Sequence, residues 1–143
     1  SGNGLNGRGS ITAFYTVLVE GEEGTDPVAE EVRSLLDGHI VLSRQLGQAG
    51  HYPAVDVLKS TSRLFPRVAS AEHQEAARHV RALLARHAEV EFLLRVGEYR
   101  QGSDALADEA IAKLPRLNEL LRQRAHEASS LDEAVAALRE LAA

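Results

Sequence analysis

Hydrophobic positions follow a helical pattern in the second part of this chain. After Ser70, apolar residues recur at intervals of three and four, the spacing of one face of an α-helix. They are Ala76, Ala77, Val80, Leu83, Leu84, Val90, Leu93 and Leu94, and His87 lies on the same face between Leu84 and Val90. With Ser70 as the N-cap, this pattern predicts a helix over 71–96, about 40 Å long at the usual rise per residue.

Shorter helices are predicted beyond this long one. A glycine-bounded turn over 97–102 precedes a helix that is capped by Ser103 or Asp104 and continues through Ala112. Pro115 is expected to open another helix, because proline is well tolerated at the first helical position.

A final amphipathic helix is predicted after Ser129 or Ser130, either of which can serve as its cap. One face of this helix is apolar and consists of Leu131, Val135, Leu138 and Leu141. Residues 70–143 are therefore predicted to form an all-α bundle.

The first part of the chain has a different pattern. Ile11–Val19 is rich in β-branched and aromatic residues and predicts a buried strand, and Gly38–Ser43 predicts a second strand. Between them, a capping residue and then Pro27 predict a short helix over 27–36. A buried strand needs neighbours on both sides, and this sequence supplies few. We therefore expect the chain to be the C-terminal part of a longer protein, after a glycine-rich loop over 1–9.

A proline-bounded segment, 50–66, connects the two parts. Pro53 and Pro66 fix φ and disfavour helix in the residues before them, so we expect an extended, stiff loop with Leu64 and Phe65 outside any helix. A stiff loop can hold side chains in fixed directions, and this one carries Tyr52 and Arg63.

Composition narrows the classes of function. The chain has 143 residues, of which 44% are hydrophobic and 26% charged, as in ordinary globular domains. A net charge of −5 argues against nucleic acid as the main partner. Cysteine is absent, which excludes disulfides and thiolate metal sites. No apolar run has the roughly 20 residues needed to span a bilayer, so we expect any membrane contact to be peripheral.

Several motifs resemble one known family. They are Tyr-Pro-Ala-Val-Asp (52–56), Ser-Thr-Ser-Arg (60–63), the segments 9–21 and 36–44, and Val-Gly-Glu-Tyr (96–99). Together they resemble the export ATPases of type III secretion, which are related to flagellar export ATPases and to the catalytic-type subunits of rotary ATP synthases. Residues 90–99 favour the injectisome branch over the flagellar one.

The resemblance implies an α/β fragment followed by an all-α domain. Residues 1–69 would be the C-terminal strands of a RecA-like nucleotide-binding core that lacks its phosphate-binding half. Residues 70–143 would be the C-terminal helical bundle domain. A Gly-x-x-x-x-Gly-Lys-[ST] loop does not occur in this sequence, so we expect the chain by itself neither to bind ATP nor to hydrolyse it.

Arg63 is the candidate catalytic residue. From residue types alone, an arginine after a serine-rich turn is most often a surface or salt-bridged residue. The resemblance implies instead an arginine finger, which acts in trans on the phosphoryl group bound by a neighbouring subunit.

Tyr52 is the candidate for stacking on the adenine base. From residue types alone it is more often a packing tyrosine, but the resemblance places the Tyr52–Pro53 pair against the base. A later helix would supply the second wall of the pocket, with Leu120, Gln123 and Ala125 where the synthase subunit has aromatic residues. We expect a looser and more polar pocket.

We find no pattern that predicts a metal site. The six histidines are scattered, and the acidic residues at 22, 23 and 26 fit a solvated turn. ATP and Mg²⁺ are expected only in the full-length protein.

The resemblance implies a homohexameric ATPase in the cytoplasm, at the inner-membrane face of the secretion apparatus. It would couple ATP hydrolysis to release of chaperones and to unfolding and export of effectors. Its partners would be chaperone-effector complexes and the central stalk and stator proteins. The alternatives are a flagellar export ATPase, which shares these motifs, and a non-catalytic helical adaptor that binds chaperone or stalk proteins.

Overall fold

The computed structural model describes residues 2–3, 9–19 and 26–143. It forms two compact units, Ser1–His39 and Ile40–Ala143, and each is described by itself. The predicted domain boundary after residue 69 stays a prediction. Most of the glycine-rich start and the predicted turn at Glu22 and Glu23 lie outside the described residues.

The first unit contains a short ribbon. Strand β1 (Gly2–Asn3) pairs antiparallel with β2 (Ser10–Ile11). Residues 12–19 have no regular structure, and Phe14 and Leu18 are 86% and 89% exposed. The predicted buried strand over Ile11–Val19 is therefore wrong. An apolar strand is buried only where other strands cover it, and within the described residues its one pairing is that of β2 with β1.

Helix α1 (Pro27–Leu35) confirms the predicted short helix. The Asp26 carboxylate accepts hydrogen bonds from the backbone N–H groups of Val28 (2.9 Å) and Ala29 (3.3 Å). Pro27 occupies the first turn, where its missing N–H costs nothing.

Strands β3 (Gly38–Leu42) and β4 (Val55–Ser62) are hydrogen-bonded neighbours, with α2 (Arg44–Gln48) between them in the chain. Strand β3 confirms the second predicted strand. The segment 50–66 was expected to be an extended loop, but about half of it, Val55–Ser62, is strand β4. Helix α2, which the hydrophobic pattern did not reveal, begins after Ser43, whose hydroxyl accepts from the N–H of Leu46.

A short helix, α3 (Phe65–Val68), follows β4. Leu64 has helical dihedrals, so the expectation that Leu64 and Phe65 avoid helix is wrong. Pro66 lies in the first turn of α3, where a helix needs no donor from it.

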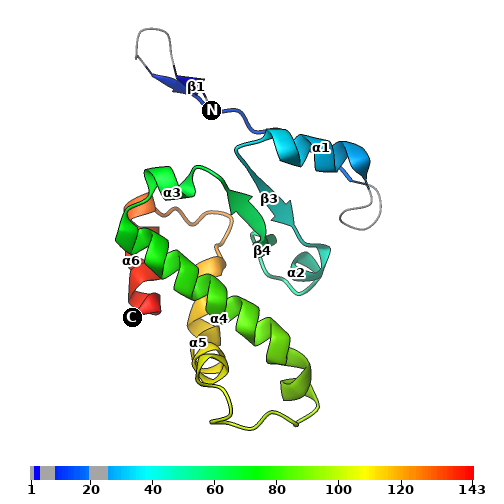
Figure 1. The fold of residues 1–143 in the computed structure, drawn as a ribbon, viewed down its shortest axis with the longest axis vertical. Helices are drawn as coiled ribbons and strands as arrows, with labels where there is room; N and C mark the ends of the chain where they lie inside the picture. Colours follow the sequence, from blue (N-terminus) through cyan, green and yellow to red (C-terminus); the bar gives the residue numbers. More distant parts are fainter. Residues whose placement is uncertain (1, 4–8, 20–25) are drawn as a thin grey trace. The chain divides into compact units, whose positions relative to one another are not determined.

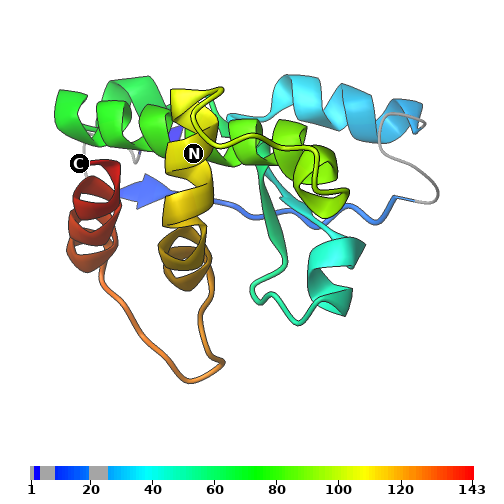
Figure 2. The ribbon, with the colours of Figure 1, turned by 90° about the horizontal axis from the view of Figure 1, so that it is seen from below.

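The rest of the second unit is helical (Figures 1 and 2). Its helices are α4 (Ala71–Arg95), α5 (Ala105–Leu121) and α6 (Leu131–Ala142). Figure 2 shows α5 and α6 next to each other and both against α4, in agreement with the contacts among the three. Ser70, Asp104 and Ser130 cap them as predicted, and Ser130 forms a capping box with Glu133. No helix in the described part of the chain is long and apolar enough to cross a bilayer.

Pro115 does not open a new helix. It lies inside α5, which continues for six more residues to Leu121. An interior proline removes one backbone hydrogen bond. Leu117, two residues later, is completely buried, so apolar packing holds this part of α5 in place.

The core of the bundle lies where the three helices meet. Leu83 of α4 and Leu117 of α5 are 0% exposed, and Leu141 of α6 is 3% exposed. Val80 and Ala110 complete the buried cluster, and partly buried residues pack against it. These are Leu84, Leu120, Leu138 and Ala142.

Polar contacts join the same helices at their margins. One Glu109 carboxylate oxygen lies 2.9 Å from His79 Nε2 of α4 and 2.9 Å from Lys113 Nζ of its own helix. Lys113 also donates to the backbone carbonyl of Leu141 in α6. Arg139 of α6 pairs with Glu72 of α4 at 2.7 Å. Contacts through His79, Glu109 and Lys113 thus link all three helices.

We expect Leu117→Ala to lower the free energy of unfolding of the helical bundle by about 2–5 kcal/mol, because it leaves a cavity between three helices. The measurement is urea unfolding of the chain followed by circular dichroism. Leu131→Ala is the control, since Leu131 is 75% exposed, and it should change this free energy by less than about 0.5 kcal/mol. Equal effects of the two substitutions would contradict the location of the core.

Glu109 should make the stability of the bundle pH-dependent. Hydrogen bonds from His79 and then Lys113 hold the pKa of Glu109 below its ordinary value. A carboxylate with a lowered pKa in the folded state stabilises fully above its unfolded pKa of about 4.3, and this contribution is lost as the pH falls through the folded pKa. Glu109→Gln should therefore be less stable than wild type near neutral pH. The difference should shrink on acidification in urea unfolding measured at a series of pH values, and a constant difference would contradict the role.

Candidate nucleotide-contact site

The first candidate region is the connection from α2 to β4. Gly50 has a φ of 69°, a left-handed conformation that glycine adopts without strain, and it lets the chain turn back after α2. His51 is 6% exposed and its N–H donates to the Leu46 carbonyl at 2.9 Å. The next peptide, Tyr52–Pro53, is cis. Tyr52 itself is 60% exposed, so its ring is accessible while the backbone on its N-terminal side is anchored.

The loop after α5 packs against this connection. The backbone N–H of Gln123 donates to the Tyr52 carbonyl at 2.9 Å. Arg122 Nε donates to His51 Nδ1 at 3.4 Å. Two segments about seventy residues apart in sequence are thereby joined by hydrogen bonds on either side of the tyrosine.

An open cavity of about 530 Å³ lies between these segments. It is lined by Gly50, Tyr52, Arg122, Gln123, Arg124 and Ala125. The structure thus brings together three of the five predicted base-pocket residues, namely Tyr52, Gln123 and Ala125.

The other two predicted residues do not line this cavity. Pro53 is exposed beside Tyr52, and Leu120 packs against the core of the bundle. The second wall is a loop and not the helix we expected, because α5 ends at Leu121. Leu120 is still within the helix, on the face that packs against the core of the bundle.

Two arginines of the cavity were missed from the sequence. Arg122 and Arg124 flank Gln123, and their position beside a predicted pocket residue was the only available signal. The Gln123 side chain is engaged within its own loop, where Nε2 donates to the Glu127 carbonyl at 3.0 Å. The charged and aromatic groups that line this cavity are thus two guanidiniums and the tyrosine ring. Both can stack on a planar base.

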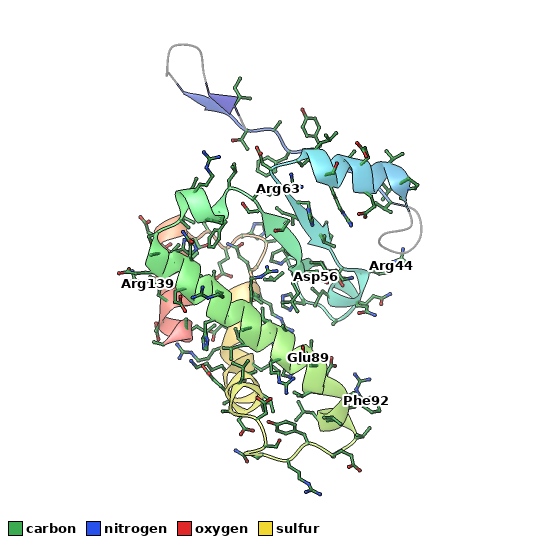
Figure 3. The ribbon with its side chains drawn as sticks, viewed as in Figure 1. Arg44, Asp56, Arg63, Glu89, Phe92 and Arg139 are labelled. Carbon is green, nitrogen blue, oxygen red and sulfur yellow. The ribbon has the colours of Figure 1, made fainter. Side chains whose placement is uncertain are left out.

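Arg63 lies at the other end of β4. It follows the last strand residue, Ser62, directly, and its side chain is exposed. Figure 3 shows Arg63 near the junction of β4 with α3, and Asp56 near the start of the strand. Tyr52 precedes β4 and Arg63 follows it, so the two residues lie at opposite ends of this strand.

Side chains and neighbouring backbone fix the middle of β4. Asp56 accepts from the N–H of Lys59 at 3.2 Å, and the Ser60 hydroxyl donates to the Asp56 carbonyl at 2.6 Å. The same hydroxyl accepts from the N–H of Val41 in β3 at 3.0 Å. Ser60, three residues before Arg63, therefore has a defined position.

Metal-binding groups do not gather in the described part of the chain. Among these residues, no cluster of three or more histidine or acidic side chains is close enough to hold an ion.

Comparisons with known proteins show which families the chain matches. Residues 69–140 match the family T3SS EscN ATPase C-terminal domain. Residues 1–62 match the nucleotide-binding domain of the ATP synthase alpha/beta family.

Individual relatives belong to the same families. A type 3 secretion system ATPase of Sinorhizobium fredii is 58% identical over 92% of this chain and 29% of its own length. A flagellum-specific ATP synthase of Treponema pallidum is 54% identical over 91% of this chain and 29% of its own length. The chain thus spans about three tenths of the curated relatives it matches.

Solved structures resemble the chain as well. The assembled ATPase EscN of the enteropathogenic E. coli type III secretion system covers 94% of this chain and 32% of its own, with a TM-score of 0.89 and 42% identity. EscN in complex with its central stalk EscO covers 82% of this chain and 29% of its own, with a TM-score of 0.78 and 39% identity.

Fold and matches define a class: the end of an ATP synthase-type nucleotide-binding domain followed by a helical domain. This confirms the predicted fold class. More narrowly, the chain belongs to the family of type III secretion ATPase C-terminal domains, as the sequence motifs indicated.

Proposed function

We propose that this chain is the C-terminal portion of a type III secretion ATPase. In the full-length protein, ATP hydrolysis would release chaperones from effectors and unfold the effectors for export. One observation carries the proposal: a secretion-ATPase helical domain directly follows the end of a nucleotide-binding domain that exposes Tyr52 and Arg63.

Arg63 would act as an arginine finger in trans. Tyr52 and Arg63 lie at opposite ends of β4. In this proposal the two residues serve different nucleotides, and each subunit of a homohexamer contributes to two sites. A guanidinium at a subunit boundary can spread the charge that develops on the transferring phosphoryl group.

Tyr52 would stack on adenine, with Pro53, Gln123 and Ala125 around it. The cavity formed with the loop after α5 supports this role, although Leu120 lies away from it. In this proposal Arg122 and Arg124 add polar groups to the pocket. ATP and Mg²⁺ would be held mainly by the phosphate-binding part of the full-length protein.

The expected partners are those of a secretion ATPase. They are further copies in a hexamer, the central stalk, stator proteins and chaperone-effector complexes, at the cytoplasmic face of the inner membrane. Structures of EscN as an assembled ATPase and with its central stalk support the first two.

A flagellar export ATPase is the second candidate. The flagellum-specific relative is nearly as similar as the secretion relative, at 54% against 58% identity. The stalk and stator proteins that co-purify with the full-length protein would distinguish the two.

We expect Arg63→Ala in the full-length ATPase to lower kcat by about 10³-fold or more, because the phosphoryl group loses its charge partner. The dissociation constant for ATP should stay within a few-fold of wild type. Steady-state hydrolysis and nucleotide titration measure the two effects. Arg67→Ala is the matched control, since Arg67 is another exposed arginine four residues along the chain. Wild-type turnover of Arg63→Ala would remove Arg63 from catalysis.

Mixed assemblies test whether Arg63 acts across a boundary. Arg63→Ala subunits would be combined with subunits that lack the phosphate-binding lysine of the full-length protein. An intact phosphate site can then meet an intact Arg63 only at a mixed boundary, so partial recovery of activity is expected. No recovery in confirmed mixed hexamers would contradict action in trans.

Tyr52→Ala should weaken ATP binding by about 1–3 kcal/mol, the usual loss of one aromatic-base stack. Titration with a fluorescent ATP analogue measures the affinity. Tyr52→Phe keeps the ring and should bind as wild type does. If all three proteins bind equally, the tyrosine does not stack on the base.

A further inference from the structure

One arginine of the helical domain binds the backbone of strand β4. Arg81 extends from α4, and Nη1 donates to the carbonyls of Val57 and Ser60, the latter at 3.3 Å. Nη2 donates to the Leu58 carbonyl at 3.0 Å. A single guanidinium thus holds three carbonyls of the strand.

These contacts are stronger and more directional than ordinary packing. Hydrogen bonds from a charged donor are roughly twice as strong as neutral ones, and the planar guanidinium fixes the direction of each N–H. The Ser60 hydroxyl donates back to the Asp56 carbonyl at 2.6 Å, so β4 departs from regular extended geometry over 56–60, and Arg81 binds carbonyls of this irregular part.

Arg81 itself is held firmly by its helix. Its neighbours Val80 and Leu83 are 3% and 0% exposed in the core of the bundle, so α4 cannot rotate without disrupting that core. A movement of the helical domain would therefore move the Arg81 guanidinium with it.

The strand that Arg81 binds leads directly to Arg63. Only Thr61 and Ser62 separate Ser60 from the arginine, and both belong to β4. A strand is stiff over two residues, so a shift at Ser60 would displace Arg63 by a similar amount.

We propose that Arg81 is a positioning residue that sets the location of Arg63 and so links α4 of the helical domain to phosphoryl transfer. This inference rests on the proposed role of Arg63 as an arginine finger. In this proposal Arg81 acts through the backbone carbonyls of β4 that it binds, and not on nucleotide or phosphate directly.

The test uses Arg81→Ala and Arg81→Lys in the full-length ATPase. A misplacement of about 1 Å can cost about 10²-fold in rate, so we expect kcat of Arg81→Ala to fall by roughly 10- to 100-fold. KM for ATP should stay within about twofold of wild type, because binding is not the step affected. A lysine keeps the charge without the planar fork, so Arg81→Lys should lie between alanine and wild type.

Arg78→Ala is the matched control. Arg78 lies one turn before Arg81 on the same helix, and it pairs with Glu75 of that helix. It should retain wild-type kcat. Hexamer formation and thermal unfolding are measured for every variant; if Arg81→Ala does not assemble, Arg81→Lys decides the outcome.

Combination with Arg63→Ala separates positioning from a general structural role. If Arg81 acts through Arg63, adding Arg81→Lys to Arg63→Ala should not lower kcat further. An equal further drop in that background, or a change in KM in place of kcat, would overturn the inference. Wild-type turnover of Arg81→Lys and Arg81→Ala beside a slow Arg63→Ala would overturn this inference alone. Wild-type turnover of Arg63→Ala would overturn the proposed function and this inference together.

Discussion

The structure depends on the fixed orientation of helix α4. One side of α4 places Val80 and Leu83 in the core with α5 and α6, and Arg81 between them in sequence donates to three carbonyls of β4. Because successive helical residues are related by about 100°, the apolar contacts and the guanidinium contacts cannot move independently. The packed core therefore determines where strand β4 lies relative to the helices.

Each of the two proposed nucleotide-contacting residues lies next to a contact between the helices and an earlier segment of the chain. Arg63 follows a strand bound by Arg81, and Tyr52 lies beside hydrogen bonds from Gln123 and Arg122. The helices are thus joined to the segment 51–60 at two places, one through Arg81 and one through Arg122 and Gln123. A helical domain attached by its peptide linker alone would leave both residues independent of its position.

The errors of sequence interpretation share one cause. Phe14 and Leu18 resemble a buried strand because their side chains are suited to a sheet interior, yet they are exposed here. Pro115 resembles a helix start, but packing around Leu117 keeps α5 continuous. Local propensity describes what a segment favours, whereas burial depends on which other segments are available to cover it.

Local signals in the sequence determined much of this protein. Capping residues and the spacing of leucines defined α4 almost to the residue and located the start of α6, and the Tyr-Pro and Ser-Thr-Ser-Arg motifs indicated the family. These features depend on neighbours within a few positions, which a sequence displays directly. Tertiary structure alone decided that Arg122 and Arg124 share a cavity with Tyr52, that Leu120 belongs to the core, and that Arg81 binds β4. Each is a contact between segments at least twenty residues apart. A single sequence does not show which distant segments come into contact when the chain folds.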